Sequence, residues 1–131
     1  MSSVSVQELI AADRFCNFIG VEMVDIGQGW ARAKLEITAN HLNGAGVVQG
    51  GAIFTLADLA VAAAANSHGP IALVVNSHIS YIKAVSKGTL YAEACQESDG
   101  AKLGTYAVKV TNEAGELIAG IQSMVYRKKE S

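Results

Sequence analysis

A cluster of glycines and one isolated carboxylate are the residues of this chain best suited to chemistry. Gly44, Gly46, Gly50 and Gly51 fall within eight residues, where the backbone must turn sharply or approach another group closely. Asp58 follows eight residues after Gly50, in a segment that is otherwise almost entirely apolar. A carboxylate held in such surroundings is a candidate functional group.

The segment around Asp58 reads as a buried helix that starts at the paired glycines. From Gly51 to Asn66 the sequence is apolar except at Thr55, Asp58 and Asn66, which leaves no polar face and predicts a buried helix of roughly 25 Å. It is too short and too interrupted to span a membrane. A mid-helix aspartate ordinarily lies on a solvated stripe, but no such stripe is evident here, so we expect Asp58 to be functional or specifically paired.

The elements that must position these residues follow from periodicity and turn signals. Ala31, Ala33, Leu35 and Ile37 alternate with charged residues, as in a half-buried strand. Ser67–Pro70 is a predicted break. We expect an amphipathic helix over residues 4–17, strands over 21–26 and 30–37, the central helix, and strands over 71–83, 90–97, 103–112 and 116–127.

This order predicts an α+β fold, with a largely antiparallel sheet whose inner face is covered by one long helix. A single helix cannot cover both faces of a sheet. We therefore expect the outer apolar positions, or an edge strand, to meet another subunit in a homo-oligomer.

Length and composition indicate one folded domain and exclude several classes of function. The chain has 131 residues, 50% of them hydrophobic, and a net charge of −2, which favours a compact domain. It has no basic pattern suited to nucleic acid, and we expect Arg127–Lys129 to be a solvated tail. The first fifteen residues lack the features of a secretory signal, so we expect a cytoplasmic protein in which Cys16 and Cys95 are free thiols. The histidines and cysteines have no metal-ligand spacing, and we predict no metal site.

The glycine-rich motif carries a family resemblance. Asn43-Gly44-x-Gly46-x-x-Gln49-Gly50-Gly51, followed by Asp58, resembles the hotdog-fold thioesterases of the phenylacetate-pathway (PaaI) type, in the 4-hydroxybenzoyl-CoA thioesterase superfamily. The resemblance extends from about Phe18 to Tyr126. It implies a hotdog fold, an antiparallel sheet wrapped around one long central helix, as a single domain over residues 1–131.

The resemblance also implies a reaction, the hydrolysis of an aryl-CoA or a short- or medium-chain acyl-CoA to free acid and CoA. The amide of Gly50 at the helix N-terminus would bind the developing oxyanion, and Asp58 would act as nucleophile or general base. Asn43 and Gln49 would position water or the thioester. In this family the active site lies between subunits, where Asp58 meets Gly50 of the partner subunit. We therefore expect a dimer or a dimer of dimers, with coenzyme A as part of the substrate and no other cofactor.

Further residues are candidates for substrate binding. Gly51 belongs to the same helix start, and Lys83, Lys87 and Lys102 could hold the nucleotide phosphates, although each also reads as an ordinary surface charge. His78 could line the cleft beside the acyl group, but a hydrogen-bonded structural histidine is the simpler interpretation. We expect the larger apolar and aromatic side chains to be core or subunit contacts: Phe54, Tyr81, Tyr106 and Met124.

The sequence departs from the family pattern in three places. Gln49 replaces the usual histidine, so it can orient a carbonyl group but cannot transfer a proton near neutrality. Val74 stands where many relatives have Ser or Thr, and the proline that commonly follows the long strand is absent after Lys83. The departures keep open a non-catalytic protein that binds acyl-CoA or an acyl carrier. A third alternative is an enoyl-thioester hydratase that pairs His41 with Asp58, although we expect His41 to be a loop histidine in solvent.

Overall fold

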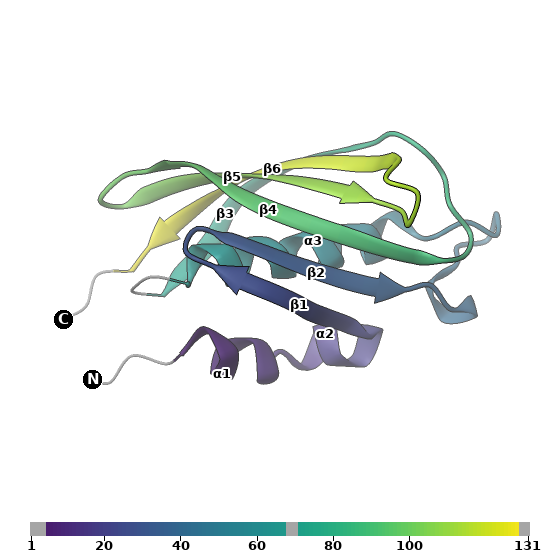
Figure 1. Cartoon of the computed structure of the whole chain (residues 1–131), viewed down its shortest axis with the longest axis horizontal. Coiled ribbons are helices and arrows are strands. Elements are labelled where there is room, and N and C mark those ends of the chain that lie inside the picture. The colour runs from purple at the N-terminus through teal and green to yellow at the C-terminus, as the bar shows by residue number, and fades with distance from the viewer. Residues whose placement is uncertain (1–4, 68–70, 129–131) are drawn as a thin grey trace.

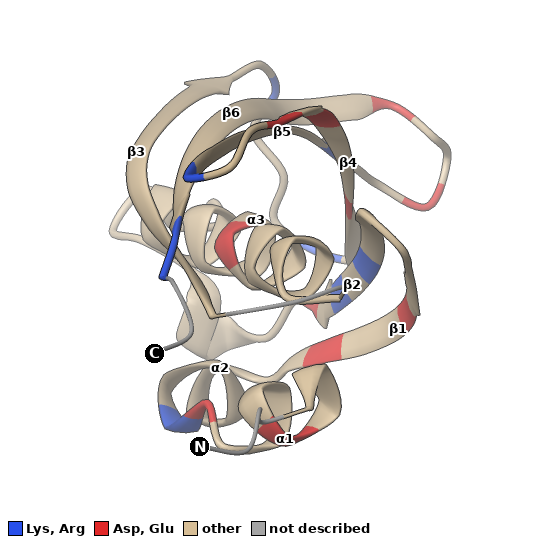
Figure 2. Cartoon of the chain, turned by 90° about the vertical axis from the view of Figure 1, so that its left-hand side faces the viewer, with Lys and Arg blue, Asp and Glu red and all other residues tan. Residues whose placement is uncertain are grey.

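The computed structural model describes residues 5–67 and 71–128, and in it one antiparallel sheet curls around a single long helix (Figures 1 and 2). Across the sheet the strand order is β1-β2-β4-β5-β6-β3, and every neighbouring pair is antiparallel. The long helix, α3 (Gly50–Ala65), lies in the hollow of the sheet. The predicted hotdog fold and the order of strands and central helix are confirmed. The strands are β1 (Val21–Gly27), β2 (Trp30–Glu36), β3 (Ala72–Tyr81), β4 (Thr89–Asp99), β5 (Leu103–Thr111) and β6 (Leu117–Arg127).

Small side chains allow α3 to pack closely against the sheet. The helix contains seven alanines, and most of its residues are buried. On the sheet it faces the alternating positions of β2 and β4, where alanine again predominates. Helix and strand backbones can therefore approach without cavities. The buried residues on these two strands are Ala31, Ala33, Leu35, Leu90, Ala92 and Ala94.

The N-terminal helix is two short helices rather than one, which corrects the prediction of a continuous helix over residues 4–17. α1 (Val6–Ala11) begins at a capping box between Ser5 and Glu8. α2 (Arg14–Ile19) begins at Asp13, whose carboxylate accepts a hydrogen bond of 2.9 Å from the amide of Cys16. Because an N-cap residue has extended backbone angles, Asp13 interrupts the helix. Val4 lies outside the described residues, as do residues 68–70 of the predicted break at Ser67–Pro70.

Arg127 holds the C-terminal end of α3 to the sheet, so the expected solvated tail at this position is wrong. Its side chain is buried and donates three hydrogen bonds, to the carbonyl oxygen of Ala65 (2.7 Å), the hydroxyl of Tyr106 (2.9 Å) and the carboxylate of Asp99 (3.0 Å). A cation at the last turn of a helix also complements the helix dipole. Lys128 is exposed, and Lys129 lies outside the described residues.

No helix in the described part of the chain is long and apolar enough to cross a membrane.

Candidate active site

The N-terminus of α3 presents one free backbone donor. The N-cap residue Gln49 accepts a hydrogen bond of 2.6 Å from the amide of Gly51 through its side-chain oxygen, and one of 2.9 Å from the amide of Ala52 through its backbone oxygen. Among the described residues, no acceptor binds the amide of Gly50. A free N–H at a helix N-terminus is suited to bind negative charge on oxygen.

The side chain of Gln49 therefore has a defined orientation. Because its oxygen is bound to Gly51, its Nε2 atom is the part of the amide that can donate to a further group. An orienting role for Gln49 toward a substrate therefore stays a prediction. The absence of a side chain at position 51 makes room for this cap, since a Cβ atom there would lie 2.5 Å from the Gln49 side-chain oxygen and would displace it.

Asn43 shapes the loop that leads into α3. Its side-chain oxygen accepts hydrogen bonds from the amides of Ala45 (2.9 Å) and Val47 (3.3 Å), and Gly46 adopts a positive φ of 80° in the same turn. The oxygen of Asn43 is thus engaged by the loop backbone. Its exposed Nδ2 atom is the group that can meet a ligand.

His41 is a buried structural residue, so the expectation of a histidine in solvent is wrong. Its Nδ1 atom accepts a hydrogen bond of 2.9 Å from the amide of Thr38, and its Nε2 atom lies 2.7 Å from the carbonyl oxygen of Ile19. Because a backbone N–H occupies Nδ1, the proton must reside on Nε2, which donates to Ile19. Both ring nitrogens are engaged, Nδ1 within the loop and Nε2 in holding the loop to the end of α2.

Asp58 is a half-buried carboxylate on α3. Burial, followed by the nearby carboxylate of Asp13, raises the pKa of Asp58 above its ordinary value. Within the described chain, Asp58 has no hydrogen-bond or ion-pair partner. Burial, with Asp13 and Asp58 adding to it, likewise raises the pKa of the Cys16 thiol to about 12, so these three groups lie in one region between α2 and α3.

The surroundings of Asp58 differ in one respect from the sequence-based expectation. α3 is not buried on every side, because a narrow stripe of half-buried residues follows its length in the single chain. The expectation that α3 has no partly exposed stripe is therefore wrong, although Asp58 is the helix's only charged residue (Figure 2). The stripe comprises Phe54, Thr55, Asp58 and Ala62.

Gly50 and Asp58 do not form a single site within one chain. They are eight residues apart on the same helix, and a rise of 1.5 Å per residue separates their backbones by about 12 Å along the axis. An aspartate side chain cannot bridge that distance. Within one chain the two groups therefore cannot act on the same bond of a substrate.

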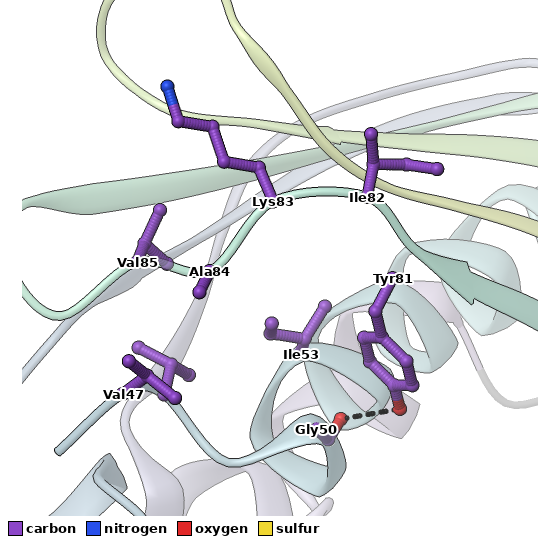
Figure 3. A pocket seen from close by; sticks show the side chains of 9 residues that line it. Val47, Gly50, Ile53, Tyr81, Ile82, Lys83, Ala84 and Val85 are labelled. Carbon is purple, nitrogen blue, oxygen red and sulfur yellow. Dashed lines mark hydrogen bonds between the residues drawn. The ribbon is translucent and has the colours of Figure 1, made fainter. Parts of the chain in front are cut away.

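An apolar pocket of about 480 Å³ opens beside Gly50 (Figure 3). It lies between the first turn of α3, the end of β3 and the segment that follows β3. The hydroxyl of Tyr81 donates a hydrogen bond of 3.0 Å to the carbonyl oxygen of Gly50 at its edge. The pocket is lined by Val47, Val48, Gly50, Ile53, Tyr81, Ile82, Lys83, Ala84 and Val85.

Sequence analysis missed the place of Tyr81 in this site. We expected a core or subunit contact; Tyr81 is not in the core, because it is 52% exposed in the single chain and lines the pocket, and a subunit contact stays a prediction. No local signal marks it, because its partner Gly50 lies 31 residues away. Tyr106, by contrast, is fully buried, as expected for a core residue.

The candidate lysines do not gather around the pocket. Lys83 lines it but forms an ion pair with Glu116, and Lys87 lies exposed in the same connection between β3 and β4. Lys102 lies in the turn between β4 and β5, where its carbonyl oxygen binds the amide of Arg127. The amide of Lys83 binds the carbonyl oxygen of Ile118, on the same strand as Arg127. Ile118 and Arg127 are nine residues apart on β6, so Lys83 and Lys102 lie about 30 Å apart at 3.3 Å per residue.

His78 is exposed on β3, and its side chain has no hydrogen bond within the described residues, so the structural, hydrogen-bonded interpretation is wrong. It points to the opposite side of the strand from Ser77, which bonds to Ser123 (2.8 Å) on the inner face. His78 is therefore on the outer face of the sheet, away from the pocket. The described chain contains no group of three or more His, Cys, Asp or Glu residues placed to hold a metal ion.

Comparison with known proteins identifies the family. The model of the thioesterase superfamily matches residues 45–119, which include the start of α3 and the whole helix. The chain belongs to the thioesterase superfamily. It is a thioester hydrolase of the PaaI-like hotdog type.

Curated relatives of this thioesterase match it over most of its length. An Archaeoglobus fulgidus protein named "Putative esterase" is 40% identical over 119 residues, which are 90% of this chain and 77% of the relative. The acyl-coenzyme A thioesterase PaaI of Escherichia coli is 29% identical over 116 residues, 88% of this chain and 83% of PaaI.

Solved structures of similar proteins share its fold. The Escherichia coli PaaI structure superposes with a TM-score of 0.92 at 26% identity, and covers 97% of this chain and 93% of its own. The structure of smu.793 from Streptococcus mutans, bound to acetyl-CoA, superposes with a TM-score of 0.82 at 27% identity and covers 86% of this chain and 92% of its own.

Proposed function

We propose that this thioesterase hydrolyses an aryl-CoA or a short- or medium-chain acyl-CoA to the free acid and CoA. The observation that carries the proposal is the free amide of Gly50 at the start of α3, beside an apolar pocket. The similarity to PaaI, named as an acyl-coenzyme A thioesterase, and to a protein crystallised with acetyl-CoA supports CoA as the carrier. Coenzyme A is part of the substrate, and the reaction needs no other cofactor.

Each residue has a role in the proposed reaction. The amide of Gly50 stabilises the oxyanion that forms on the thioester carbonyl oxygen. As general base, Asp58 takes a proton from the water that attacks the carbonyl carbon; as nucleophile, it attacks the carbonyl carbon itself and forms an acyl anhydride, which water then hydrolyses to the free acid. In either case the C–S bond breaks, and the departing CoA thiolate takes up a proton. The free Nε2 atom of Gln49 and Nδ2 atom of Asn43 orient the thioester and water. Gly51 contributes by allowing Gln49 to cap the helix.

We propose that each active site combines Asp58 from one subunit with Gly50 of the partner subunit. Two observations support a homodimer. The two groups lie too far apart along α3 to act on one thioester within a single chain, so a site that uses both would need a second chain. In addition, β3 is an edge strand with exposed apolar side chains, Leu73 (61% exposed) and Val75 (58%). Exposed apolar edge strands are ready to pair with another chain. Two such dimers would associate as a homotetramer in the cytoplasm, where the free thiols Cys16 and Cys95 persist.

The two alternative functions have less support. A hydratase that pairs His41 with Asp58 would need a ring nitrogen of His41, and both are engaged with backbone groups. A non-catalytic binding protein would gain nothing from a half-buried carboxylate without a partner, which costs folding energy.

The test is release of free thiol from a panel of aryl-CoA and acyl-CoA thioesters, with Asp58→Asn measured in parallel. We expect the wild-type protein to turn over at least one thioester. The rate of the variant should fall by about 100-fold, because asparagine keeps the shape of the aspartate side chain but removes its charge. If both proteins bind an acyl-CoA and neither releases thiol, the binding-protein alternative replaces this proposal.

Subunit mixing tests the shared site. Gly50→Pro removes the N–H at the first helical position, where proline fits the backbone, and Tyr81→Ala is added to make room for the ring. The experiment unfolds and refolds two inactive proteins together, Asp58→Asn and Gly50→Pro/Tyr81→Ala. Each mixed dimer that forms has one site in which Asp58 and Gly50 are both native. We expect recovery of about a quarter of the wild-type activity, because half of the dimers are mixed and each has one such site, in which Gly50 lies beside the native Tyr81 of the same chain. No recovery would refute the shared site.

A further inference from the structure

Tyr81 makes an unusual contact for an exposed side chain. It stands at the end of β3 and reaches the first turn of α3, where its hydroxyl donates to the carbonyl oxygen of Gly50 at 3.0 Å (Figure 3). Its side chain remains 52% exposed, so burial of apolar surface explains little of this arrangement. The hydrogen bond is the specific feature of the contact.

The contact requires glycine at position 50. A Cβ atom built on Gly50 would lie 2.9 Å from both Cζ and Oη of Tyr81, closer than the 3.5–4.0 Å of an ordinary carbon contact. Glycine lets the ring approach, but two successive glycines also leave the start of the helix with the greatest conformational freedom. The first turn therefore needs external groups to hold it.

Hydrogen bonds on both sides supply that restraint. The peptide group between Gly50 and Gly51 is held through its oxygen by Tyr81 and through its N–H by the side chain of Gln49 (2.6 Å). The preceding peptide group is held through the oxygen of Gln49 by the amide of Ala52 (2.9 Å). The N–H of this preceding peptide group belongs to Gly50 and is the donor left free. The direction of that N–H is fixed because the groups around it are all hydrogen-bonded.

We propose that Tyr81 is a positioning residue for thioester hydrolysis: its hydroxyl fixes the first turn of α3 so that the amide of Gly50 points at the developing oxyanion. This inference rests on the proposed role of Gly50 as oxyanion donor. Preorganised donors accelerate a reaction because they need no reorientation in the transition state. Loss of the hydroxyl should therefore lower kcat and leave substrate binding nearly unchanged.

The test compares Tyr81→Phe with the wild-type protein on the best acyl-CoA of the panel. We expect kcat to fall by about fivefold to thirtyfold, with KM within about twofold, because the ring that lines the pocket is kept. The matched control is Tyr126→Phe, since Tyr126 is also partly exposed but lies on β6 and is not part of the pocket. The control should retain the wild-type kcat. An unchanged kcat in Tyr81→Phe, with active wild-type enzyme, would overturn the inference.

A second measurement separates this inference from the proposed function. Amide NMR resonances of Gly50 and Gly51 should shift in Tyr81→Phe, while the resonance of Gly29, whose amide binds Ser67 beyond the opposite end of α3, should not. If the wild-type protein hydrolyses no thioester, the proposed function fails, and the resonances alone decide whether Tyr81 holds the helix start: shifted resonances support it and unshifted ones overturn it. Shifted resonances with an unchanged kcat would overturn the positioning role while leaving Gly50 as oxyanion donor.

Discussion

Replacing Asp58 by asparagine should make the protein more stable while it removes activity. Asp58 has no hydrogen-bond partner within the described chain, so the change breaks no bond, and Asp and Asn have similar helix propensities. The remaining effect is the removal of a half-buried charge close to Asp13. Burial and the charge of Asp13 are the two causes that raise the pKa of Asp58. We expect a gain of about 1 kcal/mol in the free energy of unfolding. This is the low end of the range for the cost of an unsatisfied buried polar group, because the Asp58 side chain is half exposed. For a chain of this size that corresponds to about 3–5 °C in Tm.

The gain should depend on pH in a defined direction. Because the pKa of Asp58 is raised in the folded state, the folded protein binds more protons than the unfolded chain at pH values between the two pKa values, and wild-type stability rises as the pH falls through that interval. The advantage of Asp58→Asn should be full above the folded-state pKa. It should disappear below about pH 4, the ordinary pKa of aspartate, where Asp58 is protonated in both states.

Urea denaturation of both proteins at one fixed protein concentration, near neutral pH and near pH 4, measures this difference. The control is Glu36→Gln, which removes an exposed carboxylate at the end of β2 and should change stability by no more than about 0.5 kcal/mol. The reasoning is refuted if Asp58→Asn is less stable than the wild type at neutral pH, or if its advantage is the same at both pH values.

Three further changes test other parts of the structure. Gly50→Ala places a methyl group against Tyr81 and should lower kcat about tenfold or more by displacing the ring and the helix start; a kcat within about twofold of the wild type would contradict the steric explanation. Arg127→Met should cost about 3–5 kcal/mol in urea denaturation because it leaves buried acceptors without their donor, and a loss below about 1 kcal/mol would contradict this. Asp13→Asn keeps the cap of α2 but removes a charge that raises the pKa of Asp58, so the acidic limb of the pH–rate profile should move to lower pH; an unmoved limb would show that Asp58 does not set it.

Much of the fold was predictable because its signals are local. The alternation of Ala31, Ala33 and Leu35 with charged residues marks β2, and all three side chains are completely buried. The paired glycines before a long apolar run placed the start of α3 correctly at Gly50. The break between α1 and α2 was missed because Asp13 fits the helical spacing of its neighbours, and only its backbone angles reveal a cap.

The sequence by itself singled out Asp58 as a candidate, because one carboxylate in an apolar helix is costly wherever the helix lies. Contacts between distant residues decided the rest. His41 is buried by a bond to Ile19, and Tyr81 is drawn to a glycine 31 residues away. Arg127 binds the end of a helix 62 residues earlier in the chain. Periodicity records which face of an element is apolar, but it does not record which side chain fills the space above a glycine or satisfies a distant carbonyl oxygen. Those pairings arise only when the sheet closes around α3.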